Sequence, residues 1–482
     1  MELIVHSGTK TETIELKEKR NLLSVLRENG YSVNARCGGN GTCGKCGVKL
    51  LSGTLYGTET GGMYLSCQTE VGENAEIEIF ESEGGGLTSA AEKPVETDGE
   101  EGYGVALDLG TTTLAFALVH LKTGRIIGKK SCLNPQSAFG ADVISRIKAA
   151  SEGNREILSS CVKKTVNKIM AEFAAEYGVE KIVRLCVAGN TTMLHLLIGA
   201  DASGIGRAPF TPSFLDTQRY AGADAGIGCE EVVLLPSAHS FVGSDIVCGA
   251  HFVRADRSGT CALLDIGTNG EIMLFCDGRI LCTSTAAGPA FEGADIECGT
   301  GGVKGAIDSV RTENGKIVVT TIGNADPAGV CGSGLVDAVA VMLERGIIDE
   351  TGAFETGSKF VIAGDVYLSQ KDIRQFQLAK SAVAAGLCAL TARAGKTPDV
   401  LMIAGGFGFY LNRESAARVG LIEKDIAKKI DVVGNASLGG AAECLCSSAA
   451  LQACEKIAAA AQYTDLSTDE VFMEKYPEKM YF

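Results

Sequence analysis

The sequence predicts an α/β protein in two parts, with a small α+β domain at the N-terminus and a larger duplicated α/β domain after it. Two observations predict this division. Four cysteines lie among strand-like runs near the N-terminus, and an Asp-Gly-Thr pattern recurs at two buried strand ends further along. With 482 residues the chain has room for about three domains. We expect them at residues 1–80, 103–255 and 256–482, the last including a C-terminal tail.

The first part follows the order strand, strand, helix, loop and further strands. ELIVHS and TETIELK have the short β-rich composition of strands, and Leu22, Leu23 and Leu26 fall on one helical face. After the cysteines, GVKLLSG and AEIEIF supply further strand-like runs. This order within about 80 residues is typical of a small β-grasp domain.

The four cysteines have the spacing of a metal centre. The pattern is Cys37-x5-Cys43-x2-Cys46-x20-Cys67, with glycines between the first three. Three thiolates on one loop and a fourth from a distant strand is how four-cysteine [2Fe–2S] sites are built. A zinc site is the main alternative, but zinc ligands usually come as two knuckle pairs, and Cys67 stands alone. Four unliganded cysteines are a third reading. The segment resembles a ferredoxin domain, and its x5 gap matches the vertebrate-type ferredoxins.

Residues 81–102 have the composition of a linker. The stretch ESEGGGLTSAAEKPVETDGEEG is acidic, rich in glycine and serine, and lacks apolar periodicity. We expect a flexible acidic linker that lets the small domain move between partners. The alternative is an ordered strap lying on the large domain.

The large domain contains an internal repeat. Residues 105–126 and 262–280 each follow the order strand ending in Asp, Gly-Thr turn, strand, turn and strand. Asp108 and Asp265 anchor the two copies, and a carboxylate at such a strand end can hold hydrated Mg²⁺. Backbone N–H groups and hydroxyls of the turns can bind phosphate oxygens. The predicted phosphate-binding residues are Gly110, Thr111, Thr112, Thr113, Gly267, Thr268, Asn269 and Gly270.

A third element completes a nucleotide-binding set. LMIAGGFGFYLN, residues 401–412, is an apolar strand followed by Gly405, Gly406 and Gly408, against which an adenosine can lie. The three elements are similar to the phosphate-1, phosphate-2 and adenosine motifs of the acetate and sugar kinase, Hsp70 and actin superfamily. That resemblance implies two RNase-H-like halves with ATP between them. A P-loop is excluded because GxxxxGK[ST] does not occur in the sequence.

The whole chain resembles the ATP-dependent reductive activators of corrinoid proteins. Besides the combination of domains, the similar stretches are 187–199, 241–250, 286–299, 331–337 and 464–482. Larger members of that family carry an extra small domain where this chain has residues 81–102. This departure puts the oligomeric state and the identity of the corrinoid partner in doubt.

The resemblance implies a one-electron reduction of corrinoid cobalt from Co(II) to Co(I), driven by ATP. In that scheme Asp108 and Asp265 organise Mg-ATP and the attacking water, and the [2Fe–2S] cluster on the four cysteines carries the electron. The implied partners are a corrinoid protein and an electron-donating reductase or ferredoxin, with a homodimer left open.

Composition narrows the remaining classes. A formal charge of −15 argues against nucleic-acid binding, and the chain start lacks the pattern of a signal peptide. No apolar stretch is long enough for a membrane span, so we expect a cytoplasmic protein. Most of the other fourteen cysteines lie in apolar runs and are expected to be buried hydrophobes. Cys444 and Cys446 fall on opposite sides of a predicted helix, which disfavours a shared metal, and His195 fits a packed helix histidine better than a cobalt ligand.

Three other functions stay open. The first is a metabolite kinase with an accessory redox domain, which needs a pocket for a small substrate. The second is an ATP-driven electron injector similar to the activators of 2-hydroxyacyl-CoA dehydratases, although those hold a [4Fe–4S] cluster between two ATPase subunits. The third is a non-enzymatic scaffold that responds to ATP.

Overall fold

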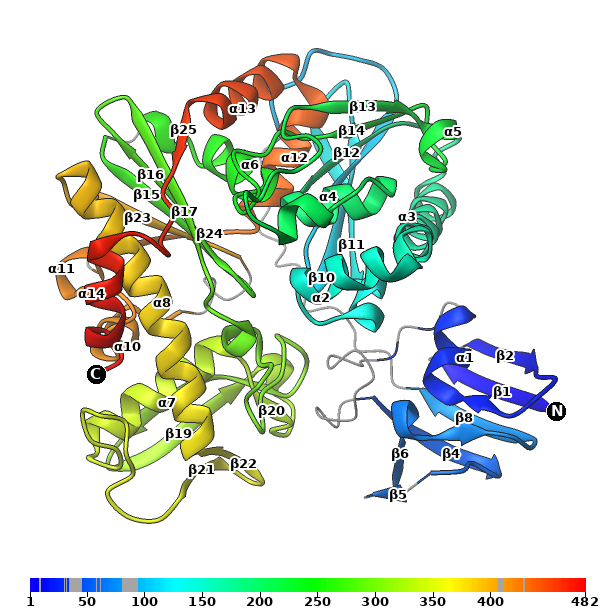
Figure 1. Ribbon diagram of the computed structural model, residues 1–482, viewed down its shortest axis with the longest axis horizontal. Coiled ribbons are helices and arrows are strands. Elements are labelled where there is room, and N and C mark those ends of the chain that lie inside the picture. Colours follow the sequence, from blue (N-terminus) through cyan, green and yellow to red (C-terminus); the bar gives the residue numbers. More distant parts are fainter. Residues whose placement is uncertain are drawn as a thin grey trace.

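The computed structural model describes residues 1–7, 10–29, 31, 33, 46–57, 59–60, 62–79, 94–257, 259–405, 411–427 and 430–482. These residues form a small N-terminal domain and a large domain of two halves (Figure 1). No helix in these ranges combines the length and the apolar character needed to cross a bilayer.

The small domain is a mixed sheet with one helix. Its strand order is β2-β1-β8-β4-β6-β5, with β1 antiparallel to β2 and parallel to β8. The buried leucines of the helix, Leu22, Leu23 and Leu26, pack in the core of this domain as their spacing predicts. The elements are β1 (Glu2–Ser7), β2 (Lys10–Glu15), β3 (Arg20–Asn21), α1 (Leu22–Glu28), β4 (Gly47–Gly53), β5 (Glu59–Thr60), β6 (Met63–Leu65), η1 (Ser66–Gln68), β7 (Glu70–Val71) and β8 (Ala75–Ile79).

Residues 94–102 form a strap along the large domain, without helix or strand. The backbone N–H of Val95 donates to the carbonyl of Gly124 at 2.9 Å. The side chain of Asp98 accepts a 2.8 Å hydrogen bond from the N–H of Ser448. This part of the predicted linker therefore follows the ordered-strap alternative, and residues 80–93 lie outside the described part of the chain.

The first half of the large domain is a six-stranded sheet with helices on both sides. Its strand order is β11-β10-β9-β12-β14-β13. Its elements are β9 (Tyr103–Leu109), β10 (Thr113–His120), β11 (Arg125–Leu133), η2 (Pro135–Phe139), α2 (Val143–Ala149), η3 (Ala150–Asn154), α3 (Arg155–Tyr177), β12 (Ile182–Gly189), α4 (Thr191–Ile198), η4 (Ser203–Gly206), β13 (Gln218–Ala221), α5 (Gly222–Ala225), β14 (Glu231–Leu234), α6 (Ser244–Phe252) and η5 (Ala255–Arg257).

The second half repeats this plan and carries an additional three-stranded sheet and a hairpin. Its main sheet has the order β24-β23-β15-β16-β17-β25. Its elements are β15 (Cys261–Ile266), β16 (Gly270–Cys276), β17 (Arg279–Thr285), η6 (Pro289–Glu292), β18 (Ala306–Glu313), β19 (Lys316–Thr321), η7 (Ile322–Asn324), β20 (Gly329–Val330), α7 (Gly332–Glu344), β21 (Lys359–Ala363), β22 (Val366–Ser369), α8 (Gln370–Ala394), β23 (Val400–Ala404), α10 (Arg413–Arg418), α11 (Lys424–Ala427), β24 (Ile430–Gly434), α12 (Ala436–Cys446), α13 (Ser448–Ala460), β25 (Ala461–Tyr463) and α14 (Glu470–Glu478).

The two halves have the same strand connections. β9, β10 and β11 form an antiparallel meander, and so do β15, β16 and β17. In each half a later strand, β12 or β23, adds parallel to the first strand of the meander. The duplication predicted from residues 105–126 and 262–280 is therefore confirmed as a repeated fold.

Helix α12 lies between the main sheets of the two halves and joins them. It follows β24 of the second half but packs against α6, β9 and β12 of the first half (Figure 1). The approach to α6 is close because Gly440 faces it: a Cβ there would lie 2.2 Å from the carbonyl oxygen of Cys248. Ala106, Leu263 and Ala441 belong to one buried cluster, so both halves share this part of the core.

Candidate functional site

Asp108 lies near the end of β9 and is held by the first residues of α12. The hydroxyl of Ser437 donates to one carboxylate oxygen at 2.8 Å, and the amide of Asn435 donates to the other at 2.9 Å. Burial raises the pKa of Asp108, although both hydrogen bonds act in the opposite direction. Since β9 and α12 come from different halves, this carboxylate links them at the first turn of the repeat.

Side chains from three other elements fix the turn after Asp108. Asn134 donates to the carbonyl of Gly110 at 2.8 Å. Thr111 is held twice: Arg146 donates to its carbonyl at 2.6 Å, and Asn190 donates to its hydroxyl at 2.9 Å. The backbone of the predicted phosphate-binding turn is thus preorganised by groups beneath it.

Arg146 is a buried cation under this turn. Its side chain is fully buried and also donates to the carbonyl of Gly140 at 3.0 Å. Burial lowers its pKa to about 10. Within the described ranges no carboxylate lies at salt-bridge distance from it. An arginine held in this way places positive charge below the turn that is predicted to bind phosphate.

The second turn of the repeat lies beside the third predicted element. Asp265 is in β15, and the N–H of Gly267 donates to the carbonyl of Asn269 at 2.9 Å. Gly405, at the end of β23, has a φ of +86°, and a Cβ there would lie 3.0 Å from a carboxylate oxygen of Asp265. Glycine at this position therefore permits both the backbone conformation and the close approach to the carboxylate.

Glu292 connects the two turns. The hydroxyls of Thr112 and Thr268 each donate a 2.9 Å hydrogen bond to the same Glu292 oxygen. Thr112 belongs to the first half, whereas Thr268 and Glu292 belong to the second. The repeat turns are therefore brought together at one carboxylate.

Three further carboxyl groups have pKa values shifted by this environment. Burial raises the pKa of Asp265 to about 8, and the charges of Asp245 and Asp108 act in the same direction. Burial also raises the pKa of Asp245, in the first turn of α6, to about 7. The pKa of Glu271 is raised as well, first by burial and then by Asp245 and Asp265. A divalent cation among these oxygens would offset their repulsion, so the residues present fit Mg²⁺.

A cavity of about 200 Å³ opens next to these groups, lined by residues of both halves. Asn190, Asn269 and Glu271 form part of its wall on the side of the two turns. Much of the remaining wall is apolar and includes Ile144 and Phe241. An apolar wall suits a hydroxyl-rich metabolite poorly, which weighs against the small-substrate pocket that a kinase needs.

In the small domain, two of the four predicted cluster ligands are described, and they converge. The sulfur atoms of Cys46 and Cys67 lie 3.2 Å apart. Cys46 precedes β4 and Cys67 is in η1, and the N–H of Ser66 donates to the carbonyl of Cys46 at 3.0 Å. Two thiolates this close can bind one iron atom, so the pair fits a [2Fe–2S] cluster. Cys37, Cys43, Gly406 and Gly408 lie outside the described residues.

Three residues of the nucleotide region were not predicted from the sequence: Glu292, Asp245 and Arg146. Glu292 and Asp245 lie within the family-like stretches 286–299 and 241–250, so the resemblance marked their surroundings without giving them a role. Arg146 had no such signal. Its importance depends on the turn that packs over it, which is 35 residues away in the chain.

His195 has the packed role expected for it. Its Nδ1 lies 2.7 Å from the carbonyl of Thr191, and its Nε2 accepts a hydrogen bond from the N–H of Ser213 at 3.1 Å. The ring is buried and stacks on Phe214 at 4.0 Å between centroids. Both ring nitrogens are therefore occupied, which leaves neither one for cobalt in this conformation.

Comparisons with known proteins agree with this architecture. Three family models match in order: a 2Fe-2S iron-sulfur cluster binding domain at residues 5–72, the RACo middle region at 103–258, and the C-terminal domain of RACo, the ASKHA domain, at 259–482. The corrinoid activation enzyme RamQ of Eubacterium limosum is 33% identical over 422 residues, which cover 80% of this chain and 70% of RamQ. The chain belongs to the RACo family.

Two other RACo-like proteins extend the similarity. The [Co(II) methylated amine-specific corrinoid protein] reductase of Methanosarcina barkeri is 25% identical, covering 78% of this chain and 76% of that protein. A solved structure named as a reductive activator for corrinoid, iron-sulfur protein superposes with a TM-score of 0.74 at 29% identity, covering 100% of this chain and 98% of that one.

Membership of the RACo family confirms the predicted fold and cofactors. The N-terminal domain is a ferredoxin-like [2Fe–2S] domain, and the large part is an ASKHA domain that uses ATP and Mg²⁺. The zinc alternative for the four cysteines is set aside. RACo proteins are ATP-dependent activating enzymes, which also sets aside the non-enzymatic scaffold.

Proposed function

We propose that this protein reduces the cobalt of a corrinoid protein from Co(II) to Co(I), with the electron passing through its [2Fe–2S] domain and ATP hydrolysis driving the step. The main support for this proposal is that one chain of the RACo family combines a cluster-binding domain with a duplicated nucleotide site. The relatives in this family are named for corrinoid activation or reduction.

For the cluster, we assign Cys37, Cys43, Cys46 and Cys67 as ligands. The 3.2 Å approach of the Cys46 and Cys67 sulfurs supports these two as ligands of the same iron. A [2Fe–2S] cluster supplies a one-electron carrier, which matches the one-electron change at cobalt. The protein's part is to hold the four thiolates and to present the cluster to a donor and to the corrinoid partner.

For the nucleotide, we assign Asp108 and Asp265 to the Mg²⁺ ion and the attacking water. Their location beside the two turns supports this, as do the raised pKa values that a cation would reverse. The turns at residues 110–113 and 267–270 would bind the phosphates, and Gly405, Gly406 and Gly408 would contact the adenosine. Gly405 already lies against Asp265, which would bring adenosine and phosphate sites together.

The link through Glu292 suggests how nucleotide could change the protein. In the structure, the hydroxyls of Thr112 and Thr268 share one Glu292 oxygen. A phosphate at the turns competes for these hydroxyls and repels the Glu292 carboxylate. Binding ATP therefore replaces a direct contact between the halves with contacts through the nucleotide. The separation of the halves then depends on whether ATP or its hydrolysis products are bound.

Such a change is needed because the electron transfer is uphill. For one electron, each gap of about 60 mV costs about 1.4 kcal/mol. A gap of about 0.2 V would cost roughly 4.6 kcal/mol and leave well under one Co(I) in a thousand centres at equilibrium. Differential binding of the corrinoid partner to two nucleotide states can supply an amount of this size.

The partners follow from the same scheme. A corrinoid protein would bind where both the cluster and the large domain can act on it. A second electron donor, a reductase or a ferredoxin, would reload the cluster after each transfer. Self-association into a homodimer stays a prediction, which sedimentation of the cluster-loaded protein would test.

The experiment is anaerobic mixing of the cluster-loaded protein with a Co(II) corrinoid protein, a chemical reductant and Mg-ATP. We expect Co(I) absorption that requires ATP and the cluster together. Phosphorylation of a small metabolite, with no response to any corrinoid protein, would favour the kinase alternative instead. Co(I) formation at the same rate without ATP would contradict the coupling.

A further inference from the structure

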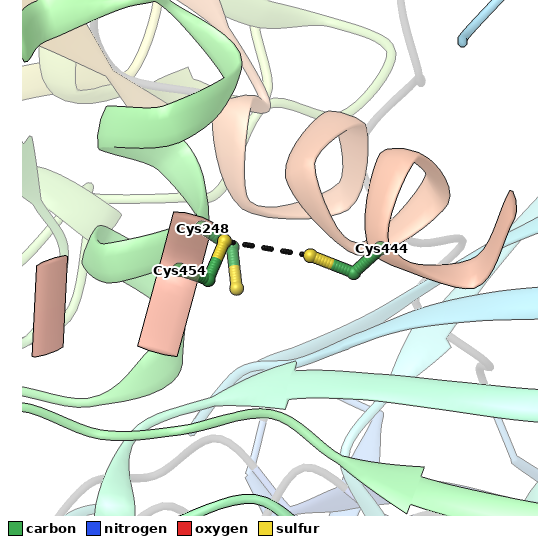
Figure 2. A group of neighbouring side chains, drawn as sticks. All are labelled: Cys248, Cys444 and Cys454. Atoms are coloured by element: carbon green, nitrogen blue, oxygen red, sulfur yellow. Dashed lines mark hydrogen bonds between the residues drawn. The ribbon is translucent and has the colours of Figure 1, made fainter. Parts of the chain in front are cut away.

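Three cysteines outside the cluster domain meet in the core of the large domain. Cys248 comes from α6, Cys444 from α12 and Cys454 from α13, and all three are buried. Figure 2 shows the sulfur of Cys444 pointing toward that of Cys454, with the side chain of Cys248 beside Cys454. The three sulfurs lie within 4.8 Å of one another, and those of Cys444 and Cys454 are 3.4 Å apart.

The helix packing explains why they meet. Gly440 lets α12 approach the backbone of α6 at Cys248. Cys444 is four residues after Gly440 and so lies on the same face of α12, one turn further along. Ser447 is both the last cap of α12 and the N-cap of α13, so the chain turns sharply there and brings Cys454 back to the same place.

Cys454 differs electrostatically from the other buried cysteines of this core. Burial raises the pKa of Cys261 to about 11 and that of Cys282 to about 12, as expected for isolated thiols. Burial likewise raises the pKa of Cys248. The pKa of Cys454, by contrast, is lowered, because it shares hydrogen bonds with Cys248 and Cys444. Among these buried thiols, Cys454 is the one for which the thiolate is favoured.

Two basic side chains lie next to the three cysteines. His251, one turn after Cys248 on α6, has its Nε2 3.3 Å from Glu443. Arg254 donates to both oxygens of Glu443, at 2.8 and 2.9 Å. Both His251 and Arg254 further favour the thiolate of Cys454. A negatively charged sulfur site therefore has positive charge close by in an otherwise apolar core.

We propose that Cys248, Cys444 and Cys454 bind a soft d¹⁰ metal ion, zinc(II) or copper(I), as a structural centre of the large domain. A metal–sulfur bond of about 2.3 Å puts bound sulfurs roughly 3.8–4.0 Å apart. The sulfurs of Cys444 and Cys454 are 3.4 Å apart and all three lie within 4.8 Å of one another, so small side-chain rotations would reach this spacing. Thiolate ligands select ions of this class. Metal binding displaces the sulfhydryl protons of the ligands, so protons are released as each ion binds.

The position of the site gives the ion a structural role. Helix α6 carries Asp245 in its first turn, and α12 starts next to Asn435 and Ser437, which hold Asp108. A metal joining these helices would fix the groups behind both turns of the nucleotide site. The ion itself would lie in the core and contact neither nucleotide nor cobalt.

The test starts with the full-length, cluster-loaded protein, purified anaerobically and supplied in separate arms with zinc(II) chloride or with a copper(I) complex. We expect about one zinc or copper per chain beyond the cluster iron. The variants Cys248→Ser and Cys454→Ser should lose more than four fifths of that metal. The control Cys282→Ser should keep it, since Cys282 is equally buried but is not part of the group. The control Cys67→Ser should lose iron only.

A second measurement keeps the test valid if a variant folds poorly. Metal added to the reduced wild-type protein should release protons in a weakly buffered indicator solution, and raise the melting temperature by several degrees. Absence of metal in both arms would overturn the proposal. Equal metal content in the wild type and in the Cys248→Ser and Cys454→Ser variants would overturn it too. So would a disulfide between two of Cys248, Cys444 and Cys454 in metal-free protein, identified by peptide mapping without reduction.

Discussion

Thr112 donates a 2.9 Å hydrogen bond to Glu292, which lies 180 residues later in the chain and in the other half of the large domain. Thr268, from the second copy of the repeat, donates to the same oxygen at the same distance. The two copies of one sequence pattern therefore reach the same carboxylate from positions that are not equivalent, because Thr268 aligns with Thr111 and Thr112 aligns with Asn269. The residue that joins the copies belongs to neither of them.

Glu292→Ala should slow ATP turnover, because it removes the link between the two turns. Removing the acceptor leaves two hydroxyls without their shared partner, and hydrogen bonds to a charged group contribute about 1.5–3 kcal/mol each. We expect ATP turnover to fall at least tenfold, measured by phosphate release. Glu292→Gln should recover much of the activity, because its amide oxygen can still accept. The control Glu313→Ala removes an exposed glutamate of the same half and should leave turnover unchanged. Equal loss in the Ala and Gln variants would show that charge, and not the link between the turns, is what matters.

Arg146→Lys should weaken nucleotide binding more than the chemical step. Lysine keeps the charge but cannot donate to Thr111 and Gly140 together, so the first turn loses part of its support. We expect the KM for Mg-ATP to rise about tenfold, in line with the loss of one charged hydrogen bond. Steady-state kinetics over a range of ATP concentrations would show it. The comparison variant Lys148→Arg changes an exposed cation on the same helix and should have wild-type kinetics. A fall in kcat with an unchanged KM would contradict the positioning role.

Asp265→Asn should make the Mg²⁺-free protein more stable at alkaline pH while abolishing hydrolysis. The folded-state pKa of Asp265, about 8, lies above the ordinary value of about 3.9, so the folded protein holds a proton that the unfolded chain releases. The contribution of Asp265 to the free energy of unfolding is fully present below about pH 4. It falls as the pH rises above that value and is lost as the pH rises through 8. Melting curves at pH 5.5 and 8.5 should therefore show a larger variant advantage at the higher pH. Saturating Mg²⁺ should stabilise the wild type more at pH 8.5 than at pH 5.5, and the reverse order would count against the site.

Cys67→Ser should uncouple the two activities. The variant should lose the red-brown colour and the cluster iron, about two atoms per chain, and yet retain ATP binding, because the cores of the two domains are separate. It should form no Co(I) in the mixing experiment. Asp265→Asn should behave in the opposite way, with a cluster that dithionite reduces and cobalt that stays Co(II). Retention of cluster iron in the Cys67→Ser protein would remove Cys67 from the ligand set.

Much of the fold could be predicted because its signals are local. The strand, turn and strand of residues 105–126 appear again at 262–280, and both copies form the same meander. The spacing of Leu22, Leu23 and Leu26 likewise predicted the buried face of the helix in the small domain. Periodicity and repetition report on neighbours in the chain, and these features depend on such neighbours.

The parts of the site that escaped prediction depend on contacts across the fold. Arg146 acquires its role because the turn at Thr111 packs above it. Cys444 was expected to be a small hydrophobe on a helix, and it is buried. The group that it forms with Cys248 and Cys454 draws on three helices and has no spacing pattern in the sequence. Only the close crossing of α6 and α12 brings these sulfurs together.

The strap at residues 94–102 has a consequence for the rate of electron delivery. Its hydrogen bonds hold the strap to the large domain. The chain between Ile79 and Pro94 therefore sets how far the small domain can lie from the large domain. That length cannot exceed roughly 50 Å even when fully extended. A sphere of this radius around Pro94 corresponds to a local concentration on the order of 3 mM for Ile79, the residue that attaches the small domain. At the micromolar concentrations of ordinary assays, the electron carrier is thus already present at its site of use. Cutting the chain between the two domains should make the rate of Co(I) formation depend on the concentration of the small domain. In the intact chain this rate should not depend on protein concentration in that way.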